Sequence, residues 1–175
     1  MKRIFIASLA LILVSCVPKI ITQDGKKYGT ITWEGGNFAY VTYVWKGGKF
    51  DDAVALFTKL DDLIKSRNLN EQVIGRYPSG KEWQIGFIAV QPVKVDSVGG
   101  YKLEQMTIPQ GIYASMKTVG YTDMLFLYWG TFRKILLNDG FKVESPVFEI
   151  YNEQTFDPKI QVADRKGELR YKITK

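Results

Sequence analysis

The chain has 175 residues, a formal net charge of +6, one cysteine and no histidine. Its length and its 46% hydrophobic content predict a single domain with a sizeable core. One cysteine excludes an internal disulfide, and the lack of histidine excludes Ser-His-Asp and Cys-His catalytic groups. It also removes the commonest protein ligand of zinc and haem, so we expect no metal and no cofactor.

The beginning of the chain is typical of an export signal. Lys2 and Arg3 precede an apolar run over residues 4–14. That run has the length of a secretory signal core and is too short to span a bilayer. We therefore predict a signal peptide over residues 1–15.

The string LVSC, residues 13–16, resembles a bacterial lipobox, in which the cysteine is acylated. The resemblance implies a lipidated Cys16, followed by a tether that completes residues 16–27, and attachment to a membrane of the cell envelope. Val17 stands where an aspartate often marks inner-membrane retention, which favours an outer membrane if the cell has one. The alternative is an ordinary cleaved signal, with Cys16 as a chance neighbour.

The basic residues are scattered along the chain and form no stripe with interleaved aromatic residues. We therefore expect no nucleic-acid partner. Loss of Lys2 and Arg3 with the signal would leave a charge of about +4, which suits a surface beside anionic lipid headgroups. The sequence predicts no particular protein partner.

The first half of the predicted domain begins with an aromatic and β-branched strand over residues 37–45. A helix follows from about residue 51 to 67, with Asp51 or Asp52 as its cap. Its apolar residues recur at helical spacing and predict the buried stripe Val54, Leu56, Phe57, Leu60 or Asp61, Leu63 and Ile64. A hairpin over residues 73–77 and 81–90 completes this half.

The second half shows the same order. Strands are predicted over residues 101–108 and 111–119, then a helix from Thr122 or Asp123 to about residue 138. Its apolar face is predicted to hold Met124, Leu127, Tyr128, Phe132, Ile135 and Leu136. A strand over residues 147–151 and one or two strands within residues 160–173 follow.

The two halves, about residues 28–98 and 99–175, can be overlaid. Gly36 and Phe38 fall against Gly111 and Tyr113 at one constant offset. We therefore predict an α+β fold in which a βαββ unit is used twice, with pseudo-twofold symmetry. A chance alignment of two α+β halves is the alternative.

Three stretches of the sequence resemble the GyrI-like family, a small-molecule-binding fold also found as the effector-binding part of AraC-type and multidrug-sensing regulators. They are WQIGFIAV, IPQGIYASMKTVGY and YWGTFRKILLNDGFKVESPVFEIYNE. The resemblance covers most of residues 28–175, although the segment after Phe156-Asp157-Pro158 departs from the usual family ending. It implies a curved antiparallel sheet with two main helices behind it and a ligand groove near the twofold axis.

The resemblance also implies that the acidic residue of the Phe-Glu-x-Tyr strand, here Glu149, faces the pocket. Strand alternation places Val147, Glu149 and Tyr151 on one face, and we expect Phe148 and Ile150 to pack against the helices. An ionised carboxylate among apolar neighbours is costly unless it is paired. The sequence leaves four alternatives for the Glu149 carboxylate: it pairs with a bound ligand, with an internal Lys or Arg, or with a hydrogen-bonding tyrosine, or it faces water.

The predicted ligand-binding residues combine this carboxylate with the abundant aromatic side chains: Glu149, Tyr151, Tyr113, Trp83, Tyr40 and Trp129. Aromatic faces favour a bound cation. A place in the hydrophobic core is the alternative for each ring, and for Trp129 it is the favoured one.

We therefore predict a lipid-anchored protein that binds a small amphipathic or cationic molecule, with no catalytic residue. The alternative is a hydrolase of strained small electrophiles, like the cyclopropyl hydrolases with this fold. Glu149 would then act as general base, with Tyr113 or Tyr151 as its hydrogen-bond partner. Haem or tetrapyrrole binding, as in the related SOUL domains, is weakened by the lack of histidine. Gyrase inhibition is not expected of an exported protein.

Overall fold

A computed structural model describes residues 17–46, 51–66, 72–79, 81–89, 93–94, 96–152 and 159–175. The predicted signal peptide and Cys16 lie outside these residues. The first half contains β1 (Lys19–Ile20), β2 (Gly29–Trp33), β3 (Gly36–Val44), α2 (Asp51–Ser66), β4 (Val73–Tyr77) and β5 (Glu82–Ala89). The short strand β6 (Ser97–Val98) lies at the boundary between the halves. The second half contains β7 (Tyr101–Ile108), β8 (Gly111–Val119), the 3-10 helix η1 (Thr122–Tyr128), α3 (Trp129–Asn138), β9 (Lys142–Tyr151), the 3-10 turn η3 (Val162–Asp164) and β10 (Lys166–Thr174).

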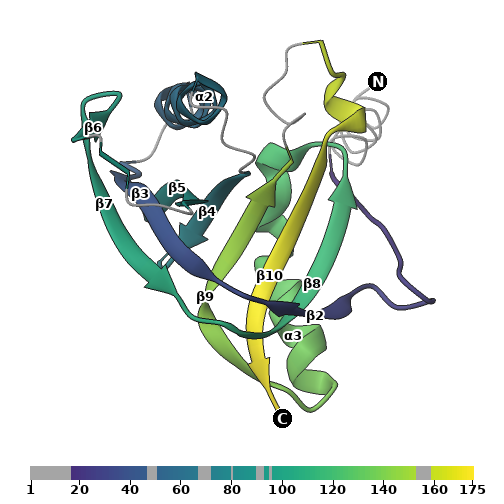
Figure 1. Cartoon of the computed structure of the whole chain (residues 1–175). Coiled ribbons are helices and arrows are strands. Elements are labelled where there is room, and N and C mark those ends of the chain that lie inside the picture. The colour runs from purple at the N-terminus through teal and green to yellow at the C-terminus, as the bar shows by residue number, and fades with distance from the viewer. Residues whose placement is uncertain are drawn as a thin grey trace, which may run out of the picture.

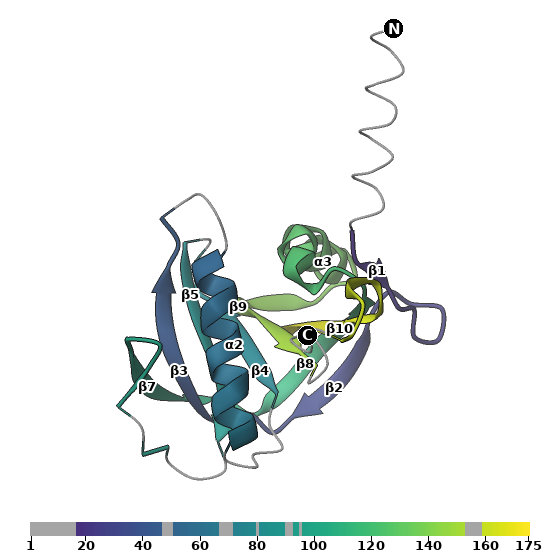
Figure 2. The same ribbon diagram turned by 90° about the horizontal axis from the view of Figure 1, so that it is seen from above.

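The strands form one curved antiparallel sheet (Figure 1). Its order is β1-β8-β10-β9-β4-β5-β3-β7-β6, and β2 pairs with β8 beside this path. The helices α2 and α3 lie over the same face of the sheet, one above each half (Figure 2). The predicted α+β fold with two main helices is therefore confirmed.

The strand pairing shows how the two halves are joined. At the centre β4 pairs with β9, and Gly75 is the register partner of Glu149. At the two sides the halves exchange strands, because β7 of the second half pairs with β3 and β2 of the first half pairs with β8. The sequence analysis did not predict β2, which is short and directly follows the expected tether.

Both faces of the sheet are buried. On the helix face, Val147 and Tyr151 belong to the large core that also contains residues of α2 and α3. On the opposite face, Phe148 and Ile150 pack in a smaller apolar cluster. The expectation that Phe148 and Ile150 pack against the helices is therefore wrong, although the predicted alternation along the strand is correct.

The helices also differ in detail from their predicted faces. Val54 is 52% exposed, and Ala53 occupies the buried position at the start of the α2 stripe. Thr122–Tyr128 forms a 3-10 helix with no side-chain cap, so neither Thr122 nor Asp123 caps a long α-helix. A 3-10 helix has three residues per turn, which rotates its buried face. Leu125 is consequently buried and Leu127 is 49% exposed, the reverse of the prediction for Leu127.

Part of the segment assigned to a tether is attached to the domain. Lys19 and Ile20 pair with Val119 and Thr118 at the edge of β8. The Tyr128 hydroxyl donates to the Pro18 carbonyl oxygen at 2.5 Å. The chain is thus held against the end of β8 and η1 from Pro18 onward. Within the described residues, no helix combines the length and the apolar content needed to cross a membrane.

Candidate functional site

Glu149 lies at the centre of the molecule, in the middle of the strand pair that joins the two halves. Its side chain is 3% exposed and points to the helix face of the sheet, as do its alternate neighbours Val147 and Tyr151. A carboxylate in such a place loses most of its hydration, so its partners decide whether the charged form is tolerated.

The partners of the Glu149 carboxylate are neutral. The Trp129 indole Nε1 donates to Oε1 at 2.7 Å, and the Tyr151 hydroxyl donates to Oε2. The hydroxyls of Tyr151 and Tyr77 are hydrogen-bonded at 2.9 Å, which extends the network to β4. Among the described residues, no lysine or arginine forms an ion pair with this carboxylate.

Aromatic rings from both halves surround this network. Phe57 of α2 meets Tyr151 edge-on at 4.9 Å between ring centroids, and Tyr77 lies 4.6 Å from Trp129 of α3. Trp83 of β5 packs against Tyr77 at 5.8 Å. We call these six residues the Glu149 cluster: Phe57, Tyr77, Trp83, Trp129, Glu149 and Tyr151.

Burial determines the ionisation of the cluster. Loss of hydration raises the pKa of Glu149 to about 7, and the hydrogen bonds from Tyr151, Tyr77 and Trp129 only partly offset this. Burial, followed by the nearby Glu149 charge, raises the pKa of both Tyr77 and Tyr151 well above the usual value. The two tyrosines are therefore neutral donors at physiological pH, and Glu149 changes its charge close to neutrality.

Gly75 provides the space that Tyr77 occupies. A Cβ atom at Gly75 would lie 2.5 Å from the Tyr77 hydroxyl oxygen and 2.6–2.7 Å from its ring carbons Cε2 and Cζ. The phenol of Tyr77 therefore folds back over Gly75, directly across the strand pair from Glu149. A larger residue at this position would push the phenol away from the network.

Four of the six predicted site residues come together in the cluster: Glu149, Tyr151, Trp83 and Trp129. The other two lie on the opposite face of the sheet. Tyr40 stacks on Phe38 at 5.2 Å, and Tyr113 contacts Trp33 at 4.9 Å and donates to the Pro109 carbonyl. The structure therefore separates Tyr40 and Tyr113 from Glu149.

Tyr77 and Phe57 also belong to the site, although the sequence pattern did not predict them. Within the β4–β9 pair, Val73 is the partner of Tyr151 and Tyr77 is the partner of Val147, so the two tyrosines hold equivalent places. The internal repeat could have identified Tyr77 through this equivalence. Phe57 likewise occupies in α2 the place that the repeat assigns to Trp129 in α3.

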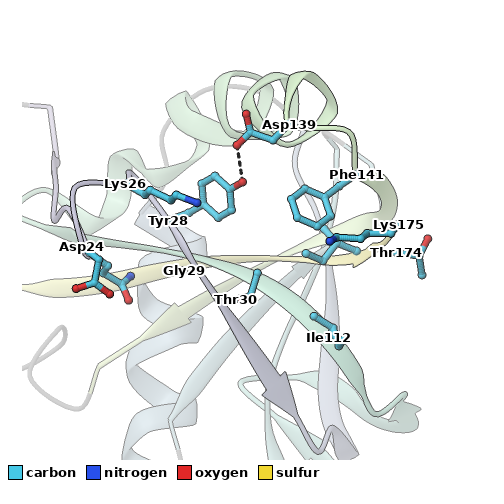
Figure 3. A pocket seen from close by; sticks show the side chains of 12 residues that line it. Asp24, Lys26, Tyr28, Gly29, Thr30, Ile112, Asp139, Phe141, Thr174 and Lys175 are labelled. Atoms are coloured by element: carbon cyan, nitrogen blue, oxygen red, sulfur yellow. Dashed lines mark hydrogen bonds between the residues drawn. The ribbon is translucent and has the colours of Figure 1, made fainter.

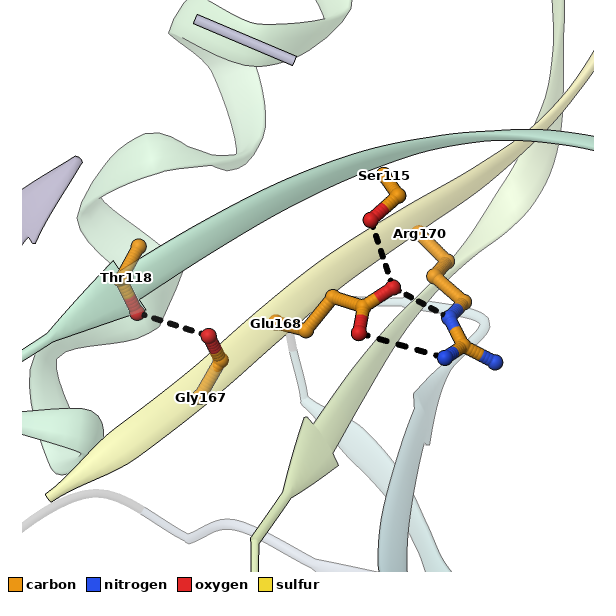
Figure 4. Close-up of polar contacts among 5 residues, drawn as sticks. All are labelled: Ser115, Thr118, Gly167, Glu168 and Arg170. Atoms are coloured by element: carbon orange, nitrogen blue, oxygen red, sulfur yellow. Dashed lines mark hydrogen bonds and ion pairs between the residues drawn. The ribbon is translucent and has the colours of Figure 1, made fainter. Parts of the chain in front are cut away.

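A partly buried acid on the opposite face, Glu168, gives a useful contrast (Figure 4). Glu168 accepts from Ser115 Oγ at 2.6 Å and from Arg170 at 2.6 Å (Nε) and 3.2 Å (Nη2). The Arg170 guanidinium in turn lies 4.7 Å from the centre of the Trp33 ring. This carboxylate is paired with an internal cation, whereas Glu149 is not.

Open hollows occur away from the Glu149 cluster. One of about 1190 Å³ lies between the start of β2 and the ends of α3 and β10 (Figure 3). Its wall includes Lys26, Phe141, and Tyr28, whose hydroxyl donates to Asp139 at 2.5 Å. The wall of this hollow carries both acidic and basic residues, so its charge does not indicate which class of ligand it would bind. Within the described part of the chain, no group of three or more acidic or cysteine side chains could hold a metal ion.

Comparison with known proteins supports the fold. No protein-family model matches the sequence, and no curated protein matches it significantly. Among solved structures, EcmrR bound to DNA has a TM-score of 0.67 at 10% identity; 85% of this chain and 57% of that chain are aligned. The EcmrR C-terminal domain has a TM-score of 0.59 at 14% identity, over 85% of this chain and 98% of that domain.

A hydrolase from Listeria innocua is also similar, with a TM-score of 0.55 at 16% identity over 94% of this chain and 98% of the hydrolase. These identities are low, so the likenesses concern the fold alone. The chain spans little more than half the length of the EcmrR chain in the DNA complex. The GyrI-like fold implied by the sequence resemblance is thus present.

Proposed function

We propose that the protein binds a small amphipathic cation at the Glu149 cluster. The observation that carries this proposal is a carboxylate that is 3% exposed and lies among aromatic rings. Its hydrogen-bond donors within the described residues are all neutral. A ligand cation would supply the missing positive charge. The rings would supply apolar contact and a favourable quadrupole, at about 0.5–2 kcal/mol for each ring facing the cation.

The cluster is closed in the present structure, so binding requires a side chain to move. Trp129 is a partly exposed member of the cluster and lies at the first position of α3. Its indole would have to release Glu149 Oε1 for a cation to take its place. Since a buried hydrogen bond is exchanged for an ion pair, the change favours a charged ligand over a neutral one of equal shape.

The proposal can be tested with an aromatic quaternary ammonium compound and its uncharged carbon isostere. Tryptophan fluorescence of the full chain should report binding of the cation at least about tenfold tighter than of the isostere. Glu149→Gln keeps the size of the side chain and should abolish that preference. Glu168→Gln is the matched control and should retain it. Retention of the cation preference by Glu149→Gln, or equal affinity of the original chain for both compounds, would contradict the assignment of Glu149 as the counter-ion.

The cation should also bind more tightly as the pH rises. A cation pairs with the ionised form of Glu149, whose pKa in the free protein is raised to about 7. Affinity should therefore increase by up to about tenfold per pH unit below 7 and level off above it. An affinity that does not change between about pH 5 and 8, a range that brackets this pKa, would show that Glu149 is not the counter-ion.

A second candidate function is hydrolysis of a strained small electrophile. It is favoured by the Glu149 pKa of about 7, which suits a general base near neutral pH. Glu149 would accept a proton from water as the water oxygen attacks the strained ring. The electron pair of the breaking ring bond would pass to the leaving ring atom, which would take that proton back from Glu149. Turnover of a strained cyclic substrate that disappears in Glu149→Gln, while ligand binding persists, would distinguish catalysis from binding alone.

We also propose that Cys16 is acylated and that the domain acts at the surface of an envelope membrane. The support is the LVSC string after a signal-like run. Labelled palmitate should be incorporated into the original chain and not into a Cys16→Ser variant. An unlabelled original chain, recovered without membranes, would contradict the anchor and leave the ligand proposal untouched.

A further inference from the structure

The two main helices occupy similar places in the two halves but differ in charge. α2 carries the four aspartates Asp51, Asp52, Asp61 and Asp62 together with Lys59 and Lys65. α3 carries Arg133 and Lys134 and no acidic residue, and η1 before it adds the one acid Asp123. Within the described residues, neither Arg133 nor Lys134 forms a salt bridge. The outer side of α3 is therefore a small basic surface.

Exposed apolar side chains accompany these cations. Leu127 at the end of η1 is 49% exposed and Leu137 in the last turn of α3 is 45% exposed. Lys134, Arg133 and the exposed Gly130 lie three, four and seven residues before Leu137, so these positions share one side of the helix. Phe126, also exposed, extends the apolar part at the η1 end.

The chain leads from this surface directly to Cys16. The Pro18 carbonyl is held by the Tyr128 hydroxyl at 2.5 Å, and Tyr128 is the residue after Leu127. Two Cα–Cα steps of about 3.8 Å place the Cα of Cys16 within about 8 Å of the Cα of Pro18. β1 therefore begins beside η1, which leads directly into α3. A lipid attached to Cys16 would enter a bilayer next to η1 and α3.

We propose that the outer side of η1 and α3 is a membrane-contact surface that lies on an anionic bilayer. We define this surface by Phe126, Leu127, Arg133, Lys134 and Leu137. Its apolar side chains enter the headgroup boundary, and its two cations meet lipid phosphates, as in interfacial helices with one apolar and one basic side. The proposal builds on the proposed anchor, but the surface can be tested without acylation.

The test places a polarity-sensitive dye on either of the two helices. In a full chain carrying Cys16→Ser, the dye is attached at Leu127→Cys or, as the matched control, at the equally exposed Val54→Cys of α2. Vesicles contain equal parts of phosphatidylglycerol and phosphatidylcholine, or phosphatidylcholine alone. Emission at position 127 should shift to the blue on the anionic vesicles, and the shift should shrink at high salt. Emission at position 54 should not change.

Charge reversal tests the cations. Arg133→Glu combined with Lys134→Glu should lower the vesicle partition coefficient about tenfold or more, since each basic residue near an anionic surface adds a favourable factor. Lys59→Glu combined with Lys102→Glu changes the net charge equally on exposed sites of α2 and β7 and should leave the blue shift at position 127 in place.

Several results would overturn the proposal. Equal shifts at positions 127 and 54, no shift on anionic vesicles, or equal losses in the two charge-reversed variants would each exclude a specific surface. A blue shift at position 127 that grows with protein concentration without vesicles would assign the surface to a second copy of the chain. Because Glu149→Gln should not alter any of these readings, a failed ligand proposal would be recognised separately.

Discussion

Comparison of the buried Glu149 with the partly buried Glu168 shows how neighbouring groups determine what a carboxylate can do. Glu168 is neutralised by Arg170 and held by Ser115, so its charge is permanently satisfied. Within the part of the chain that the structure describes, the donors to Glu149 are hydroxyl and indole groups, and burial raises its pKa to about 7. The ion pair of Glu168 with Arg170 stabilises the sheet, whereas the negative charge of Glu149 can be neutralised by a bound cation.

Replacing Glu149 should make the protein more stable at neutral and higher pH. The pKa of Glu149 is about 7 in the folded protein and near 4.5 in the unfolded chain. The folded state binds the Glu149 proton more tightly than the unfolded chain does. The contribution of this proton to the free energy of unfolding is therefore complete below about pH 4.5 and is lost as the pH rises to about 7. The loss approaches about 3 kcal/mol and stays constant above pH 7.

Glu149→Gln removes this titration and keeps the size of the side chain. Its amide oxygen can accept from the Trp129 indole, and its NH2 group can donate to the Tyr151 hydroxyl oxygen. The free energy of unfolding of this variant relative to the original chain should therefore rise by about 3 kcal/mol between pH 4.5 and 8, as measured by urea denaturation. A difference that does not change with pH would mean that Glu149 ionises in the folded state as it does in the unfolded chain.

Gly75→Ala should destabilise the protein by about 1–3 kcal/mol, in the range of overpacked cores. The added methyl would lie 2.5 Å from the Tyr77 hydroxyl oxygen, so the phenol must leave its bond with Tyr151. Gly130→Ala in α3 is the matched control, because no atom lies within 4 Å of its added methyl. Thermal unfolding should show a gain of about 0.5–1 kcal/mol for that variant. A stable Gly75→Ala protein would show that Tyr77 can be repositioned without loss.

At the scale of elements, the N-terminal segment and η1 depend on one another. β1 has only two residues, and its edge position on β8 gives it few bonds of its own. The hydrogen bond from the Tyr128 hydroxyl to the Pro18 carbonyl holds the residue directly before β1 against η1. The segment therefore joins the start of the described chain to the second half of the molecule.

Tyr128→Phe should loosen this segment without unfolding the domain. Loss of one hydrogen bond, worth about 1 kcal/mol, should speed amide exchange of Ile21 about fivefold, because its N–H bonds the Lys117 carbonyl at 2.9 Å in the same segment. Exchange in β9 should be unaffected. Hydrogen-exchange NMR can measure both, and equal acceleration in β9 would mean that the substitution acts on the whole fold.

The sequence predicted most elements but not the face on which each residue lies. The period of two correctly grouped Glu149 with Tyr151, yet it could not tell which face the helices cover. Phe148 is buried although it faces away from the helices, because Trp33 of β2 covers it with 5.2 Å between the ring centroids. Its apolar character therefore does not distinguish the two faces. The exposed Leu127 was missed for a related reason, since helical spacing alone does not reveal that η1 is a 3-10 helix.

At the scale of the whole molecule, the two halves are similar units that cannot be separated. Each sends its first strand to the other half, and the Glu149 cluster combines Phe57, Tyr77 and Trp83 from one half with Trp129, Glu149 and Tyr151 from the other. If α3 lies on a bilayer as proposed, the cluster is directly beneath the membrane-contact surface, because Trp129 belongs to that helix. An amphipathic ligand dissolved in the membrane would then approach the site through the side formed by α3.

The exchange of strands predicts that the domain unfolds as one unit. Leu60 of α2 and Leu136 of α3 are both fully buried, one in each half. Truncation of either to alanine should cost about 2–5 kcal/mol. Both substitutions should move a single transition to lower denaturant concentration, because β2 and β7 carry the loss in one half to the other.

Two tryptophans allow this to be measured. Trp83 lies in the first half and Trp129 in the second, so each can be kept as the single reporter while the other three of the four tryptophans are replaced by phenylalanine. In Leu60→Ala and in Leu136→Ala, urea curves from the two reporters should coincide. A Leu60→Ala curve in which Trp83 reports unfolding while Trp129 does not would show that the halves are independent, and the exchanged strands would then contribute little to the coupling. Coincident curves would mean that a ligand which stabilises the Glu149 cluster stabilises both halves together, because binding to the folded state raises the stability of the entire cooperative unit.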